Sequence, residues 1–155
     1  MSREDMFKDM ANERILFGMF FAFGNRLQSA GDTFYKEITC KQFFLLMCLS
    51  LFEEAPTVNE LADVMGSSHQ NVKQIINKLE QKGFLKIVAD AKDKRKIRIL
   101  KTNMMDELKQ KYMKQELRFM EQLYQGVSPQ DIHITLKTIQ QLEKNLIEIK
   151  EIGNE

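Results

Sequence analysis

The side chains best suited to chemistry lie between residues 67 and 83, in the stretch SSHQNVKQIINKLEQKG. Its apolar residues recur at helical spacing, so one side of a helix is buried and the other faces outward. The outward side is rich in hydrogen-bond donors and carries almost no acid. Gln and Asn can bond adenine edges, and Lys and His can reach guanine acceptors. The candidate DNA-contacting residues of this helix are Ser67, Ser68, His69, Gln70, Asn71, Lys73, Gln74, Asn77 and Lys78.

A second candidate group is the charged run from 92 to 96. Lys92, Lys94 and Lys96 could attract DNA phosphates, and Arg95 could enter a narrow minor groove. Asp93 is better explained as the acid that orients Arg95 than as a DNA contact. Ser67 and Ser68, at the positive end of a helix, suit a backbone phosphate. Either group taken alone is equally explained as solvated surface. The choice between DNA binding and solvation therefore depends on the elements that position these residues.

Helix starts are marked by capping boxes, in which a Thr or Ser side chain and a Glu or Gln three residues later bond each other's backbone amides. The pairs are Thr39 with Gln42, Thr57 with Glu60 and Ser67 with Gln70. The last two boxes flank Gly66, which predicts two short helices joined by a tight turn. Their crossing has what a helix-turn-helix requires: a small residue, a turn glycine and branched apolar residues facing inward, supplied by Ala62, Gly66, Val72 and Ile75.

A β-hairpin is predicted directly after Gly83. Alternation of Leu85, Ile87 and Ala89, then of Ile97 and Ile99, indicates two strands separated by a charged turn from 90 to 96. A helix-turn-helix followed by a hairpin is a winged helix. The fold class is therefore mainly α with a small β-hairpin.

Long helices flank this winged helix. The first is predicted from Arg3 to about Gln28, interrupted by Gly31-Asp32, and the run from 43 to 52 is predicted as a central helix. Thr102 or Asn103 can start a helix to about residue 125, and Ser128-Pro129 opens the last one. A narrow apolar seam on this last helix indicates packing against another helix, through Ile132, Leu136, Ile139, Leu142, Leu146 and Ile149.

The charge distribution favours an acidic partner for the middle of the chain. Residues 57–102 hold ten Lys and Arg against five Asp and Glu, whereas the remainder holds thirteen against seventeen. No apolar run approaches the roughly 20 residues that span a bilayer, and no secretory signal precedes the two cysteines. We expect a soluble cytoplasmic protein with no membrane partner. No catalytic motif, metal-ligand spacing or cofactor site is found, so an enzyme is not expected.

The order of these parts resembles the multiple-antibiotic-resistance regulator (MarR) family of bacterial transcription factors. The residues that carry the resemblance are Thr39 with Gln42, ELA at 60–62, NKLEQKGFL at 77–85 and DAKDKRKIRILKT at 90–102. The last is similar to the family's wing signature through Asp90, Asp93, Arg95 and Thr102. It departs from that signature at Ala91, where Pro is usual, and at Lys101, where an apolar residue is usual.

The resemblance implies a winged-helix lobe at 39–102 within a single MarR-like unit, and dimerisation helices at 1–38 and 103–155. It implies a homodimer that places two recognition helices on a palindromic double-stranded DNA operator, usually as a repressor released by a small ligand. We expect that effector to be aromatic or lipophilic. Phenylalanines could line its cleft, although core packing explains such a set more often: Phe17, Phe20, Phe21, Phe34, Phe43, Phe44 and Phe52.

Three alternatives stay open. The basic segment could bind an acidic protein, which would make the chain a winged-helix adaptor without specific DNA binding. The chain could be a ligand-binding regulator whose DNA affinity is weak or lost. It could also be a redox-sensing regulator that uses Cys40 or Cys48, although two buried thiols are the favoured explanation of these residues.

Overall fold

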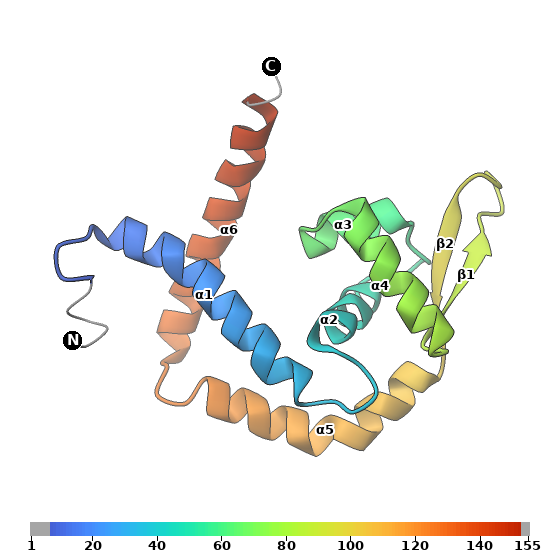
Figure 1. Ribbon diagram of the computed structural model, residues 1–155, viewed down its shortest axis with the longest axis horizontal. Helices are drawn as coiled ribbons and strands as arrows, with labels where there is room; N and C mark the ends of the chain where they lie inside the picture. The colour runs from blue at the N-terminus through green and yellow to red at the C-terminus, as the bar shows by residue number, and fades with distance from the viewer. Residues whose placement is uncertain (1–6, 153–155) are drawn as a thin grey trace. The chain divides into compact units, whose positions relative to one another are not determined.

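The computed structural model describes residues 7–152, which form six helices and one two-stranded antiparallel hairpin (Figure 1). The mainly helical fold class with a small hairpin is thereby confirmed. The chain divides into two units, with described residues 7–108 in the first and 109–152 in the second. No helix in this described range is long and apolar enough to span a membrane.

Helix α1 (Asn12–Asp32) is displaced toward the C-terminus relative to its prediction. It begins at Asn12, and the predicted start at Arg3 lies outside the described residues. Gly31 and Asp32 do not interrupt the helix but form its last turn. The helix ends instead at Thr33, whose amide and hydroxyl both donate to the carbonyl of Ala30, the hydroxyl at 2.8 Å. A helical glycine costs about 1 kcal/mol, which local capping can outweigh.

Helix α2 (Cys40–Leu49) forms the centre of the first unit. Its predicted capping box is confirmed: Gln42 donates its amide to the Thr39 hydroxyl, and the Gln42 side chain accepts the Thr39 amide at 3.1 Å. The helix stops before residue 52 because Ser50 closes it with a hydroxyl bond to the carbonyl of Leu46 at 3.0 Å. Four apolar residues of the helix are buried: Leu45, Leu46, Cys48 and Leu49.

Helices α3 (Val58–Met65) and α4 (His69–Gln81) form the predicted helix-turn-helix. Gly66 has φ 60°, a conformation that glycine adopts at no steric cost, and the Ser67 amide closes the turn onto the carbonyl of Ala62 at 3.0 Å. The predicted Ser67–Gln70 capping box is wrong. Because Ser67 is used to end α3, the following Ser68 caps α4 by accepting the amide of Asn71 at 3.2 Å.

The hairpin β1 (Leu85–Ala89) and β2 (Ile97–Lys101) follows α4. Ile87 pairs with Ile99, and the Ile99 amide donates to the carbonyl of Pro56, which fastens β2 to the segment before α3. Leu85 and Ile99 are buried. Ala89, predicted to face inward, is exposed because the strands there extend beyond the helices as a free wing.

The seven phenylalanines named above are exposed or half-buried, whereas Phe84 is buried in the core. Phe17 and Phe21 on α1 are 66% and 65% exposed in the single chain, and their rings contact each other edge to face. Phe20 and Phe44 are also exposed, and Phe34, Phe43 and Phe52 are half-buried. The core of the first unit is mainly aliphatic, as Leu61, Val72, Ile76 and Leu79 illustrate.

Helix α5 (Met104–Leu123) starts in the first unit and continues into the second, which also contains α6 (Pro129–Ile152). The predicted start of α6 is confirmed: the Ser128 hydroxyl accepts the Asp131 amide at 3.1 Å, and Pro129 is the first helical residue. No residue of α6 is buried in the single chain. The predicted seam therefore presents an uncovered apolar stripe.

Candidate nucleic-acid interface

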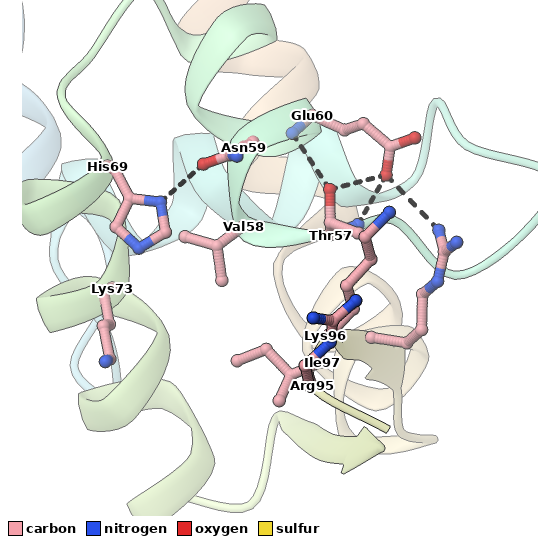
Figure 2. Close-up of a pocket in the computed structure, with 10 residues that line it drawn as sticks. Thr57, Val58, Asn59, Glu60, His69, Lys73, Arg95, Lys96 and Ile97 are labelled. Atoms are coloured by element: carbon pink, nitrogen blue, oxygen red, sulfur yellow. Dashed lines mark hydrogen bonds and ion pairs between the residues drawn. The ribbon is translucent and has the colours of Figure 1, made fainter. Parts of the chain in front are cut away.

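The wing turn, the start of α3 and the outer face of α4 line one pocket of about 520 Å³, here called the wing groove (Figure 2). The groove is basic, because its lining holds four Lys and Arg side chains and one Glu. Its lining residues are Thr57, Val58, Asn59, Glu60, His69, Lys73, Arg95, Lys96, Ile97 and Arg98. The structure thus brings two predicted residues of α4 together with two of the charged turn.

Helix α4 presents the predicted polar face outward because its inner face is fully used. Val72, Ile76 and Leu79 are each 0% exposed. The candidate DNA-contacting residues of this helix are all exposed except Ser67, which is half-buried in the turn that ends α3. His69 and Lys73 lie at the wing groove, whereas the other members of the set lie along α4 outside the groove's lining. In the described part of the chain, Lys73 forms no hydrogen bond or ion pair, so its ammonium is available to a ligand.

His69 is held from the side by a residue that the sequence pattern did not single out. Its Nδ1 atom lies 2.6 Å from Oδ1 of Asn59, the second residue of α3 (Figure 2). This contact orients the ring and leaves Nε2 for another partner. Asn59 precedes the capping residue Glu60, so its position follows from the start of α3.

The turn between the strands, here called the wing turn (residues 90–96), is ordered by Asp90. One carboxylate oxygen of Asp90 accepts the amides of Lys92 at 2.7 Å and Asp93 at 2.9 Å. The other oxygen accepts Nε of Arg98. The Arg98 bond and these amide bonds hold the pKa of Asp90 far below its usual range, so the carboxylate is charged at neutral pH.

Arg95 and Asp93 pair at the tip of the wing. Nε and Nη2 of Arg95 lie 3.1 and 3.4 Å from the two carboxylate oxygens of Asp93. The hydrogen bond from the Arg95 side chain, with a second from its amide, lowers the pKa of Asp93. The predicted orienting contact is therefore present. Lys92 and Lys94 are exposed on the turn but do not line the wing groove.

Pairing within the groove leaves an unbalanced positive charge. Arg98 is neutralised by Asp90 and Glu60, and Arg95 is partly neutralised by Asp93. Among the described residues, Lys73 and Lys96 have no acidic partner within ion-pair distance. A groove with two unpaired ammonium groups and a forked guanidinium favours a polyanion such as a nucleic-acid backbone.

The two thiols are poor candidates for redox chemistry. Cys40 is half-buried and Cys48 is buried, and both are free. Burial raises the pKa of Cys40, with a further contribution from the nearby Asp32 carboxylate, and burial raises the pKa of Cys48. The neutral thiol is the unreactive form, so these environments disfavour the redox alternative.

The chain is similar to known proteins in both sequence and fold. Residues 38–96, the segment that contains α2 through the wing turn, match the model of the MarR family. The resemblance to the MarR family is therefore confirmed. No curated protein sequence matches the chain significantly.

Many solved structures share this MarR fold. A MarR/EmrR family transcriptional regulator from Acinetobacter sp. ADP1 is 19% identical, with a TM-score of 0.77 over 90% of this chain and 99% of that one. The MepR–DNA complex of S. aureus is 18% identical, with a TM-score of 0.72 over 88% of this chain and 99% of that one. BpsR of Bordetella bronchiseptica, whose DNA binding is regulated by 6-hydroxynicotinic acid, is 15% identical, with a TM-score of 0.70 over 83% of this chain and 98% of that one. The solved structures named here share the fold of this chain.

Proposed function

We propose that the chain is a bacterial transcriptional regulator that binds double-stranded DNA as a homodimer in the cytoplasm, most simply as a repressor released by a small aromatic or lipophilic ligand. The observation that carries the proposal is the wing groove, where the outer face of α4 meets the cationic wing turn. In the groove, His69 and Lys73 of α4 lie on the same side of the lobe as Arg95 and Lys96 of the wing turn.

The outer face of α4 supplies direct readout. Its exposed amides, Gln70, Gln74 and Asn77, suit adenine edges in the major groove, and Lys73 suits guanine. Ser68 caps the start of α4, and the backbone amides at this helix start suit a DNA phosphate. The likeness to the MepR–DNA complex supports this assignment, since that structure shows the same fold with DNA.

The wing supplies the second contact. The Arg95 side chain is 92% exposed and oriented by Asp93, which suits insertion into a neighbouring minor groove. Lys92, Lys94 and Lys96 add attraction to phosphates that does not depend on sequence. The geometry thus supports separate readers for the two DNA grooves.

Uncovered apolar helices support the homodimer. On α6, Leu136, Leu146 and Ile149 are 53%, 62% and 63% exposed in the single chain, and Phe17 and Phe21 of α1 are similarly exposed. Exposed apolar surface of this kind normally marks an interface. Two copies joined through these helices would carry two α4 helices, so the matching operator is a palindrome.

A small-molecule effector is the remaining part of the proposal. BpsR, a structural neighbour, responds to an aromatic acid, which supports an effector of the same general class here. The exposed aromatic rings of α1 are candidates to contact it. The raised pKa of both thiols makes ligand control the better supported mechanism than redox control.

Selection of DNA duplexes from a random library distinguishes sequence-specific DNA binding from the adaptor alternative, in which the basic segment binds an acidic protein. The wild-type full chain is incubated with a random-sequence duplex library, and bound duplexes are amplified and sequenced through several rounds. The proposal expects enrichment of an inverted repeat with half-site centres about one helical turn, or a multiple of one turn, apart. A library that stays random would contradict sequence-specific DNA binding and would favour an acidic protein partner.

A further inference from the structure

We infer that Arg98 is a positioning residue that holds the wing turn against the start of α3, which the helix-turn-helix joins to α4, and thereby determines how well the protein discriminates its operator. This inference rests on the proposed DNA-binding function. Arg98 lies on β2, three residues after Arg95, and was not among the residues singled out in the sequence. It is the residue through which the wing turn is joined to the start of α3.

Three contacts define the role of Arg98. Its Nε donates to Oδ2 of Asp90 in the wing turn. Its Nη1 lies 3.4 Å from Oε2 of Glu60 at the start of α3, and 3.1 Å from the carbonyl oxygen of Ala55. One guanidinium therefore contacts two of the three elements that border the wing groove, the wing turn and the start of α3, and its planar fork suits several simultaneous acceptors.

Each carboxylate that Arg98 contacts also orders a chain segment. Asp90 accepts the amides of Lys92 and Asp93. Glu60 accepts the amide of Thr57 at 2.6 Å and its hydroxyl at 2.8 Å, which completes the capping box of α3 (Figure 2). Arg98 therefore connects the wing turn that Asp90 orders to the capping box of α3. This connection fixes the wing turn relative to the helix-turn-helix.

Backbone hydrogen bonds close the wing turn on itself, from Asp90 to Lys96 and from Lys96 to Asp93, but do not join it to the helix-turn-helix. The Ile99 amide bonds the carbonyl of Pro56 at 2.9 Å, and this bond lies beyond Arg98 in the direction away from the wing turn. Nothing in the described hydrogen bonds other than the Arg98 contacts joins residues 90–98 to residues 55–60. Without Arg98, the described hydrogen bonds that join the hairpin to these helices would be those at its base, from the Ile87 amide to Glu80 of α4 and from the Ile99 amide to Pro56. We expect the turn that carries Arg95 to move more freely in that case.

Arg98 is poorly suited to bind a phosphate directly. Its side chain is 33% exposed, compared with 92% for Arg95, and its charge is matched by two carboxylates. These partners raise its pKa, led by the hydrogen bond to Asp90. A phosphate would have to compete with ion pairs that are already formed. Positioning is thus the role that the geometry favours over phosphate contact.

Substitution of Asp90 and Glu60 gives the decisive test. Loss of a negative charge and loss of the positioning contact change the affinity for the operator in opposite directions. Asp90→Asn retains the oxygen that accepts the turn amides and replaces the oxygen that faces Arg98 with a donor. Glu60→Gln retains a capping-box acceptor and removes the ion pair. Each variant removes a negative charge near the DNA, so electrostatics alone predicts tighter binding. Positioning predicts weaker binding to the selected operator.

The measurement is the affinity of each full-length variant for the duplex selected by the wild type and for a scrambled duplex. We expect Asp90→Asn and Glu60→Gln to reduce the ratio of these affinities about tenfold, within the range for loss of a groove-reading arginine. Arg98→Lys, which keeps the charge without the fork, should reduce the ratio similarly and leave the salt dependence unchanged. Asp63→Asn, which removes an exposed acid of α3, is the matched control and should leave the ratio unchanged.

The outcomes separate the inference from the proposed function. Thermal melting identifies any variant that fails to fold. If one of Asp90→Asn and Glu60→Gln fails to fold, the affinities of the other variant decide the test. If the wild type prefers its selected duplex and both folded acid variants discriminate as well as the wild type, the inference is overturned alone. If Arg98→Ala reduces the salt slope by about one unit, Arg98 contacts a phosphate and positioning is overturned. A wild type without sequence preference overturns the proposed function and this inference together.

Discussion

The guanidinium of Arg95 pairs with Asp93 two residues earlier, with Nε 3.1 Å from Oδ1, while the Arg95 side chain remains 92% exposed. An ion pair this exposed contributes little to stability. Its value lies in reducing the number of conformations that a long side chain must lose on binding. The relationship therefore suits recognition more than folding.

Replacement of Arg95 should weaken operator binding without affecting the fold. We expect Arg95→Ala to cost about 1 to 3 kcal/mol of binding free energy, measured by fluorescence anisotropy on the selected duplex. Arg95→Lys, which keeps the charge but loses the planar fork, should recover the phosphate attraction and only part of the specificity. Unchanged affinity of Arg95→Ala would remove the wing tip from the mechanism.

Gly31 in the last turn of α1 is required by the approach of Cys40. A Cβ at position 31 would lie 2.4 Å from Sγ and 2.8 Å from Cβ of Cys40. Gly31→Ala should therefore lower the free energy of unfolding by about 1 to 3 kcal/mol in urea titration, as for other overpacked sites. Gly24→Ala is the control on the same helix, where a Cβ meets nothing within 4 Å, and should raise stability slightly. Equal effects of the two substitutions would contradict close packing at Gly31.

Much of the winged helix could be predicted from local rules. Thr39 with Gln42 and Thr57 with Glu60 start their helices as expected, because a capping box is complete within four residues. The third box failed by one residue. Two adjacent serines were available, and only the geometry of the Gly66 turn assigns Ser67 to the end of α3 and Ser68 to the cap of α4.

Contacts between distant residues could not be read from spacing. Arg98 contacts Glu60, which is 38 residues away, and His69 contacts Asn59 across the turn. The sequence marked Glu60 only as a cap and did not mark Arg98 or Asn59. An arginine that interrupts the apolar alternation between Ile97 and Ile99 was the available signal, but its partners depend on how the hairpin packs.

The aromatic residues of α1 were misjudged because burial was considered for one chain. Phe17 and Phe21 have the spacing of a core face, yet both are exposed in the single chain. Helical periodicity identifies a face that needs a partner without specifying whether that partner belongs to the same chain. The same ambiguity applies to α6.

Disruption of the α6 seam tests the proposed homodimer. Leu142→Glu with Leu146→Glu introduces two charges into the apolar stripe, so we expect monomers or unfolded chain in sedimentation analysis. Lys144→Glu, roughly 200° around the helix from Leu142, is the control and should leave the dimer intact. A dimer that survives the double substitution would show that the seam does not join two chains.

The thiols should be slow to react at neutral pH. Because burial raises the pKa of Cys40 and Cys48, the thiolate fraction is lower in the folded chain than in the unfolded chain. We expect iodoacetamide to alkylate the native protein more slowly at pH 7 than the urea-unfolded protein, with Cys40→Ser used to assign each site. Faster alkylation of native Cys40, or loss of operator binding on peroxide treatment that Cys40→Ser prevents, would restore the redox alternative.

The most direct test of the account is the salt dependence of binding to the DNA immediately upstream of the protein's own gene. The wild-type chain is titrated onto this duplex and onto a scrambled duplex of equal length at several salt concentrations. Each phosphate contact contributes about −0.9 to the slope of log affinity against log salt. We predict tight, preferential binding to the upstream duplex with a steep negative slope. Equal and weak affinity for both duplexes would contradict sequence-specific recognition by the wing groove.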